Sequence, residues 1–366
     1  MLDDIPELVR ALPAWTRARN QPATYPRLFT EVAASRGVPA AAVLAQAGLR
    51  PDALDDPAGR LSFVESWQVF AAVLTLTADP ALGFETGQRL PLTAHGSLGY
   101  ALMCASTARD AMHILERYWH LRGRGVLMRV QELASESTLF FELLPELPIP
   151  VPLRDLLFSS MLTSMYSGIR FLLPVFPAAA EIWLPGPEPA GFARWRDTLP
   201  VVRFGMPVAG LRLTGDVSSL DRPLLTANPE GLAAALARCE QESALMGGAA
   251  EPLRLRVRAA LQAGAAGYPT PEVIARSLHL TPRTLRRRLR DEGSSYQALL
   301  EEARRRDSSE LLARPELDIR EISAWLGYAD PANFTRAFRS WTGTTPSAWR
   351  AGQARTSAQG ISVTGE

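Results

Sequence analysis

Residues 281–289 read TPRTLRRRL, and a related stretch, DPANFTRAF, returns 49 residues later at positions 330–338. Each copy opens with a residue whose side-chain oxygen accepts an N–H at the start of a helix. Proline then takes the first helical position, where its missing N–H costs nothing. Leu285 and Leu289 lie four apart in the first copy, as do two phenylalanines in the second, so each pair shares one helix face. The pattern predicts two short helices, each burying one face.

The opposite face of each predicted helix carries arginine. Two short helices of this kind, each preceded by another helix and a tight turn, are typical of helix-turn-helix units, whose second helix enters the major groove of DNA. We therefore predict that the exposed residues of both copies contact DNA. They are Thr281, Arg283, Arg286, Arg287, Arg290, Ala332, Asn333, Thr335, Arg336 and Arg339.

The flanking segments supply the rest of both units. Thr270 begins a helix that ends at a turn at His279, and Asp318 begins another that ends at Gly327. Between the units, residues 296–313 predict a helix of roughly 27 Å. One turn of B-DNA is about 34 Å long, so this rod suits two reading helices in successive segments of the major groove.

Several motifs carry a resemblance to a known family. They are Glu321-Ile322-Ser323, Leu326-Gly327-Tyr328, Asn333–Phe338 and, most specifically, Gly343–Arg350. On these residues the region 253–350 resembles the DNA-binding domain of the AraC/XylS family of bacterial transcription regulators. The resemblance implies an all-α domain, double-stranded DNA and RNA polymerase as partners, and activation as the commoner mode of regulation.

The resemblance is not complete along the connecting helix. Asp307 stands where the family usually has an apolar residue. A carboxylate on that face needs a partner, for which Arg304 and Arg306 are both candidates. The run 304–306 is interpreted as solvated or intramolecular, with DNA contact left open.

The N-terminal two thirds mixes helical and strand patterns, which indicates an α+β domain. Helices are expected at 26–34, 40–46, 63–77, 107–121 and 152–171, and strands at 126–133, 137–144, 181–184 and 211–213. Through His95–Ala101 and Thr107–Ala111, residues 25–215 are similar to the arabinose-binding-like ligand domain of one branch of the family. That similarity implies a small-molecule effector.

The sequence does not define the effector site. Residues 94–184 are rich in apolar side chains, so we expect a small, largely apolar effector, either an apolar acid or an amino acid. Arginine binds carboxylates through a forked pair of hydrogen bonds. Weak candidates for effector contacts are His95, Tyr100, Arg109 and Arg129, with Arg117 and Arg122 also near in sequence.

Charge is distributed unevenly along the chain. All 39 basic residues are arginine; residues 250–352 carry a net charge of +5 and residues 1–249 a net charge of −4. The basic excess therefore coincides with the predicted DNA-binding region. The acidic start Met1–Asp4 and the absence of an 18-residue apolar run predict a cytoplasmic protein without a membrane partner.

These signals divide the chain into four parts: an effector-binding domain over 1–222, a linker helix and hinge over 223–250, the DNA-binding domain over 251–352 and a disordered tail over 353–366. The helix is expected from Pro223 to Met246 and the break at residues 246–250. The apolar surface of residues 1–246 predicts a homodimer.

An enzyme or repair protein tethered to a DNA-binding module is the alternative. It needs an activated thiolate, and neither Cys104, interpreted as a small core residue, nor Cys239 has a neighbourhood that indicates one. His113 and His120, seven apart, are interpreted as one face of a helix. The four histidines show no metal-binding spacing, and no nucleotide-binding loop is present, so we expect no metal, cofactor or catalytic residue.

Overall fold

A computed structural model describes residues 12–123, 125–133, 135–175, 179–246, 252–263, 267–278 and 280–359. It divides into two compact units. The N-terminal unit comprises Met1–Phe204 and Ala209–Ala249, and the C-terminal unit comprises Gly205–Val208 and Ala250–Glu366. The break expected after Met246 and the turn expected at His279 lie outside the described residues. No helix within the described ranges is long and apolar enough to cross a bilayer.

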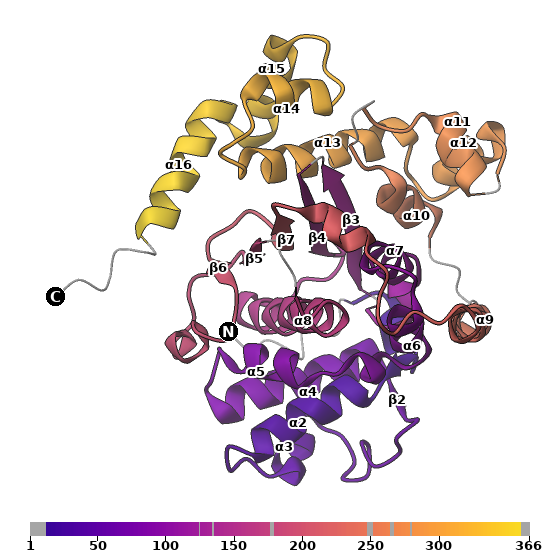
Figure 1. The fold of residues 1–366 in the computed structure, drawn as a ribbon, viewed down its shortest axis with the longest axis vertical. Coiled ribbons are helices and arrows are strands. Elements are labelled where there is room, and N and C mark those ends of the chain that lie inside the picture. Colours follow the sequence, from indigo (N-terminus) through magenta and orange to yellow (C-terminus); the bar gives the residue numbers. More distant parts are fainter. Residues whose placement is uncertain are drawn as a thin grey trace. The chain divides into compact units, whose positions relative to one another are not determined.

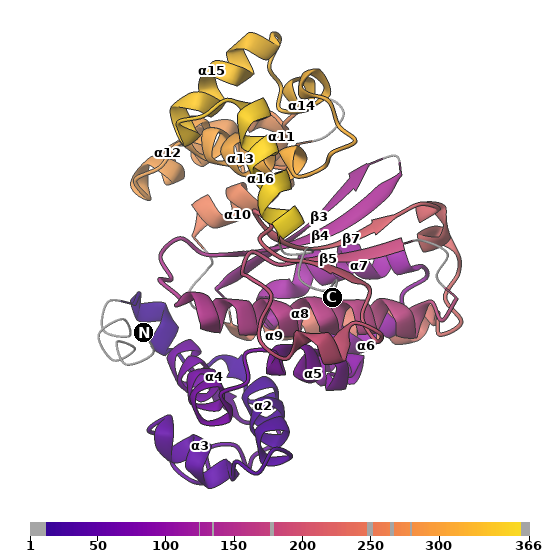
Figure 2. The ribbon, with the colours of Figure 1, turned by 90° about the vertical axis from the view of Figure 1, so that its left-hand side faces the viewer.

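A mixed sheet organises the N-terminal unit (Figures 1 and 2). In the part that the structure describes, its five strands follow the order β3-β4-β7-β5-β6. Every neighbouring pair is antiparallel except β5 and β6, which are parallel. The strands are β3 (Val126–Leu133), β4 (Glu136–Leu143), β5 (Ala179–Trp183), β6 (Val201–Arg203) and β7 (Ala209–Thr214).

One face of this sheet is covered by α7 (Ala108–Tyr118) and α8 (Val151–Leu172) (Figure 2). Side chains alternate between the faces of a strand. Val130 of β3 and its partner Leu139 of β4 therefore enter the core shared with the helices, while Arg129 and its partner Phe140 lie on the other face. The α+β prediction is confirmed.

A helical layer completes the unit with α2 (Thr24–Ala34), α3 (Ala40–Gln46), α4 (Phe63–Thr77) and α5 (Leu82–Arg89). The sequence assigned residues 24–90 to helices but did not delimit α5, whose two glycines are poor helix formers. Tertiary packing explains them: a Cβ added at Gly83 would lie 2.4 Å from the Leu156 carbonyl oxygen, and one added at Gly87 equally close to that of Ser160. The glycines let α5 approach α8 closely.

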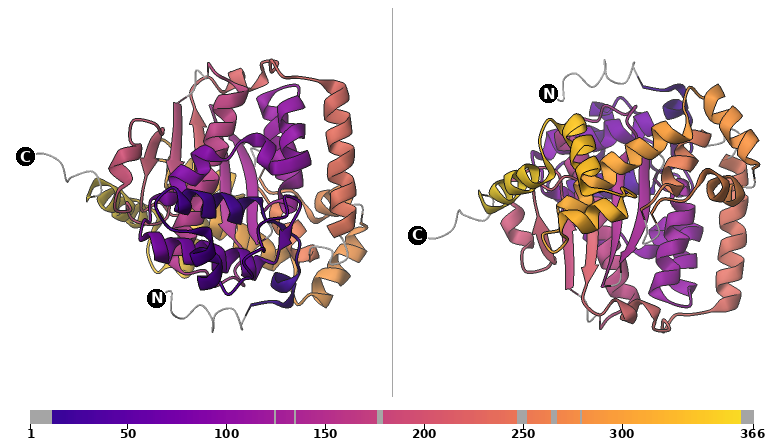
Figure 3. Two further views of the ribbon diagram at one scale, coloured as in Figure 1. Left: turned by 90° about the horizontal axis from the view of Figure 1, so that it is seen from below. Right: turned by 90° about the horizontal axis from the view of Figure 1, so that it is seen from above.

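The helix predicted from Pro223 to Met246 begins six residues later, as α9 (Pro229–Met246), so that prediction is wrong at its start. Backbone hydrogen bonds hold the preceding segment against the end of α6 (Gly96–Cys104): Leu224 N–H donates to Ser106 O and Asn228 N–H to Cys104 O. From there α9 runs along one side of the unit beside α6 (Figure 3).

The contacts of α9 correct two smaller expectations. Cys239 of α9 is fully buried, whereas Cys104 is only partly buried and is not a core residue. His113 and His120 do not share a helix face, because α7 ends at Tyr118 and His120 lies in a 3-10 turn, where it hydrogen-bonds Ser243 of α9.

The C-terminal unit is all-α, as predicted. Two small hydrophobic cores lie along α13, which contributes Leu299, Leu300 and Ala303 to the first and Leu311 and Leu312 to the second. Its helices are α10 (Leu253–Ala260), α11 (Pro271–Ser277), α12 (Pro282–Asp291), α13 (Tyr296–Leu312), α14 (Ile319–Trp325), α15 (Pro331–Thr342) and α16 (Pro346–Gln359).

Helix α16 continues beyond residue 352, where a disordered tail was predicted to begin. Residues 360–366 of that tail lie outside the described residues.

Candidate nucleic-acid interface and internal cavity

The first helix-turn-helix unit consists of α11 and α12. Thr270 and Thr281 cap these helices by accepting hydrogen bonds from Val273 N–H and Thr284 N–H. In α12 the inward residues Leu285 and Leu289 are almost completely buried, as the repeat predicted.

The second helix-turn-helix unit consists of α14 and α15, whose N-termini are also capped by side chains. Asp318 forms a capping box at the start of α14, and Asp330 accepts a hydrogen bond from Ala332 N–H at the start of α15. Between the helices Gly327 has a φ of +73°, a conformation that glycine adopts without strain. Phe334 and Phe338 fill the core beneath α15 and have no exposed surface.

The residues predicted to contact DNA lie on two helix surfaces. In α12, Arg283, Arg286, Arg287 and Arg290 are exposed, and no ion pair is recorded for them among the described residues. In α15, Ala332, Asn333, Arg336 and Arg339 are exposed.

Four of the predicted residues already use their side chains for contacts within the unit. The Thr281 hydroxyl oxygen caps α12, and the partly buried Thr335 donates its hydroxyl hydrogen to Pro331 O at 3.0 Å. Arg336 donates to the side-chain oxygen of Asn333. The arginines of α12 therefore form the more available charged surface.

Helix α13 joins the two helix-turn-helix units (Figure 1). Its 17 residues give a length of about 25 Å. The structure settles the partner of Asp307, which is completely buried: Arg306 Nε lies 2.7 Å from one carboxylate oxygen and the Tyr268 hydroxyl donates to the other at 2.8 Å. Arg304 instead donates to Leu326 O at 3.1 Å and lies over the Tyr328 ring. Both arginines therefore use their side chains for contacts within the C-terminal unit.

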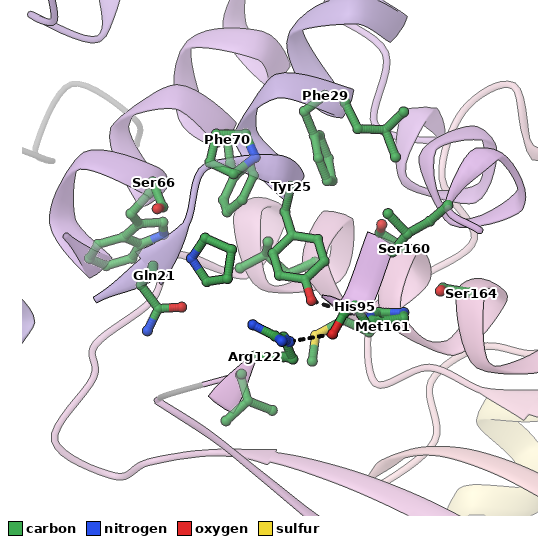
Figure 4. Close-up of a pocket in the computed structure, with 18 of the residues that line it drawn as sticks. Gln21, Tyr25, Phe29, Ser66, Phe70, His95, Arg122, Ser160, Met161 and Ser164 are labelled. Atoms are coloured by element: carbon green, nitrogen blue, oxygen red, sulfur yellow. Dashed lines mark hydrogen bonds between the residues drawn. The ribbon is translucent and has the colours of Figure 1, made fainter. Parts of the chain in front are cut away.

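The N-terminal unit contains a cavity of about 120 Å³ between α2, α4, α8 and the segment around His95 (Figure 4). Its wall is mostly apolar and aromatic. Among the described lining residues Arg122 carries the charge, and no carboxylate is present. The polar lining residues are Gln21, Tyr25, Ser66, His95, Arg122, Ser160 and Ser164.

His95 connects Tyr25 and Arg122 at one end of the cavity (Figure 4). Its Nδ1 lies 2.9 Å from the Tyr25 hydroxyl, and its carbonyl oxygen accepts a hydrogen bond from Arg122 Nε at 2.6 Å. Burial, with a further contribution from the Arg122 charge, lowers the pKa of His95 to about 4. Burial likewise raises the pKa of Tyr25 far above its usual value. Both rings are therefore uncharged at neutral pH.

The structure places the weak effector candidates in different surroundings. His95 lines the cavity, and so does Arg122, which the sequence offered only as a nearby arginine. The others lie elsewhere. Tyr100 is 53% exposed on α6, and Arg109 pairs with Asp221 and Glu132. Arg129 lies over the Phe140 ring on the sheet face opposite the helices.

The motif His95–Ala101 owes its composition to this neighbourhood. Gly96 has a φ of +58°, and a Cβ there would lie 2.7 Å from Arg122 Nη2. A Cβ at Gly99 would clash with Leu92 O at 1.7 Å. Ser97 donates its hydroxyl hydrogen to Glu242 of α9 at 2.6 Å. The two glycines permit close approach, and the serine binds the neighbouring helix.

Both the N-terminal and the C-terminal unit match known protein families. Residues 37–224 match the family described as the arabinose-binding domain of AraC transcription regulator, N-term, and residues 274–352 match a helix-turn-helix domain family. The chain belongs to the AraC family of transcription regulators. It is therefore a DNA-binding regulator of transcription with an N-terminal ligand-binding domain.

Individual relatives match this chain over most of their own length. The "Ornithine utilization regulator" of Pseudomonas aeruginosa is 31% identical over 90% of this chain and 96% of its own. The "Uncharacterized HTH-type transcriptional regulator Rv1395" of Mycobacterium tuberculosis is 30% identical over 88% of this chain and 93% of its own. The crystal structure of the transcriptional regulator CdpR from Pseudomonas aeruginosa covers 84% of this chain and 95% of its own, at 26% identity and a TM-score of 0.42.

Proposed function

We propose that this AraC-family regulator reads its operator with α12 and α15 and responds to a small molecule bound in the cavity of the N-terminal unit. The observation that carries the first part is the exposed arginine surface of α12, on a helix whose opposite face is fixed in a core. Arginine bridges guanine O6 and N7, and such a pair discriminates between bases by about 1–3 kcal/mol.

The test of DNA reading uses Arg287→Ala on α12 and Arg336→Ala on α15. Operator sequences are selected from random DNA with the wild-type protein, and affinities are measured by fluorescence anisotropy at fixed salt. Each variant should lose about 1–3 kcal/mol of specific binding while its helix content is unchanged. Arg238→Ala, an exposed arginine on α9, is the matched control. Wild-type affinity in both α12 and α15 variants would reject the assignment.

For the effector, the apolar cavity favours a small, largely apolar molecule. A relative is named for ornithine utilisation. The cavity of this chain, however, has no carboxylate among its described lining residues to pair with the ammonium groups of such an amino acid. Calorimetry of the full chain against apolar acids and amino acids tests this preference, and tight binding of ornithine would contradict it.

We further propose that the regulator acts in the cytoplasm as a homodimer and activates transcription through RNA polymerase. Support for the dimer comes from α9, which exposes Ala233, Ala234, Ala237 and Leu245, the last at 88%. Isologous dimers match paired half-sites in DNA. Sedimentation velocity at micromolar concentration should show a dimer, which Leu245→Glu should dissociate; a wild-type monomer with and without DNA would exclude it.

Against the alternative of a tethered repair enzyme, the buried thiol of Cys239 is poorly suited to nucleophilic chemistry. Burial raises the pKa of Cys239, which disfavours the thiolate. We propose that the protein has no catalytic step. Alkylation of native protein with iodoacetamide should therefore leave operator binding unchanged and should abolish no activity on DNA.

A further inference from the structure

Arg122 links the cavity to α9, the last helix of the N-terminal unit. Its Nε donates to His95 O at 2.6 Å, and its Nη2 donates to Glu242 Oε2 at 3.1 Å and to Ser97 Oγ at 3.3 Å. Ser97 in turn donates to Glu242 Oε1 at 2.6 Å. A cavity-lining guanidinium and its neighbour thus hold both carboxylate oxygens of one residue near the end of α9.

This contact is shielded from water. The Arg122 side chain is 6% exposed and that of Glu242 is 18% exposed. A guanidinium in such surroundings requires an anionic partner, because its charge is poorly solvated. Gly96, at a φ of +58°, lets the backbone come close to Arg122: a Cβ there would lie 2.7 Å from Arg122 Nη2, so one of the two would have to shift.

The cavity itself lacks partners for several polar groups. Three buried atoms on its lining residues, Trp67 Nε1, Ser66 Oγ and His95 Nε2, have no hydrogen-bond partner among the described residues. An indole N–H only donates, so its partner has to be an acceptor. The volume of about 120 Å³ is similar to that of an engineered cavity of about 150 Å³ that binds benzene. A ring or short chain bearing one oxygen acceptor group fits these limits.

We propose that the ligand is a small apolar monocarboxylic acid whose carboxylate displaces the Glu242 carboxylate from Arg122. This proposal rests on the proposed effector role of the cavity. The ligand carboxylate and the Glu242 carboxylate compete for one guanidinium, so binding in the cavity loosens the end of α9. The chain enters the C-terminal unit directly after this helix. A ligand that binds better when α9 is loosened shifts the balance between the two states of the regulator.

The experiment uses the full chain, with phenylacetate, benzoate and hexanoate as probes and the corresponding uncharged amides as controls. Glu242→Gln removes the competing charge, so it should bind the acids about 5- to 150-fold more tightly than the wild type. Because the variant lacks the Arg122–Glu242 ion pair that the ligand is proposed to break, the same variant without ligand should show the operator affinity of the ligand-bound wild type. The amides should bind no more tightly to the variant than to the wild type.

Glu240→Gln is the matched control. Glu240 lies two residues earlier on α9 and accepts hydrogen bonds from Arg117 and Tyr118 instead of Arg122. Glu240→Gln removes a contact of α9 that does not involve Arg122, so it should leave affinity for the acids unchanged, and circular dichroism should show both variants folded. Equal acid affinities for Glu242→Gln and the wild type, or failure of every acid to bind either protein, would overturn the proposal. Failure of the wild type to bind any selected operator, with and without ligand, would instead refute the proposed function.

Discussion

Replacing Asp307 by alanine should severely destabilise the C-terminal unit. Asp307 is completely buried on α13 and accepts hydrogen bonds from Arg306 and Tyr268. Arg306 also donates to Leu261 O at 2.7 Å, so the cluster ties α13 to the segment that follows α10. In Asp307→Ala the Arg306 side chain, only 9% exposed, loses this anion, and the Tyr268 hydroxyl loses its acceptor.

The cost follows from the burial of these groups. Removing one partner of a buried ion pair destabilises a protein by about 3–5 kcal/mol. In a unit of about 100 residues, each kcal/mol shifts Tm by about 4–8 °C, so the loss is at least about 12 °C. Burial and the neighbouring Asp307 raise the pKa of Tyr268, so its phenol remains a donor at neutral pH.

Hydrogen exchange of the α13 amides in the full chain measures this loss separately from the N-terminal unit. Arg305→Ala, an exposed neighbour on the same helix, should change the opening free energy by less than about 0.5 kcal/mol. Arg306→Met combined with Asp307→Ala should recover part of the loss, because it removes a buried charge that has lost its Asp307 partner. An Asp307→Ala protein within 1 kcal/mol of the wild type, or a double variant less stable than the single one, would refute the reasoning.

Three further perturbations test other parts of the structure. The pKa of His95 is lowered to about 4, against about 6.5 in an unfolded chain, so the unfolded chain binds the proton more readily. The free energy of unfolding should therefore fall by about 3 kcal/mol as the pH drops from above 6.5 through 4. Urea denaturation should show this extra slope in the wild type and not in His95→Gln. Gly96→Ala should cost about 1–3 kcal/mol in thermal unfolding, because of its positive φ and the contact with Arg122, whereas Gly352→Ala, where an added Cβ would meet no atom within 4 Å, should not. Phe338→Ala should cost about 3–5 kcal/mol in denaturation of the C-terminal unit, and an unchanged midpoint would contradict its place in the core.

The secondary structure of the C-terminal unit was predictable because its signals are local. Thr281, Asp318 and Asp330 cap helices through bonds to residues two or three positions away. The apolar residues four apart needed only helical periodicity to be assigned to the core. The same kind of signal predicted the bounds of α3 and α4. It did not delimit α5, whose glycines are explained only by the close packing against α8.

Contacts between distant parts of the chain required the tertiary structure. From the sequence, Arg304 and Arg306 were both candidate partners of Asp307. In the structure Arg306 is the partner, because it also hydrogen-bonds Leu261 O while Tyr268 binds the other Asp307 oxygen. It likewise placed Arg109 and Arg129 among the effector candidates, because proximity in sequence does not show which way a strand or helix turns a side chain.

The sequence by itself determined that the chain carries two helix-turn-helix units after an α+β domain, since caps, prolines and apolar spacing act within a few residues. Only the tertiary structure decided which polar groups meet. The cavity is assembled from elements between Gln21 and Met165, and Arg122 reaches Glu242 across 120 residues of chain. Such contacts depend on the long-range packing of helices and strands, which places each side chain in space.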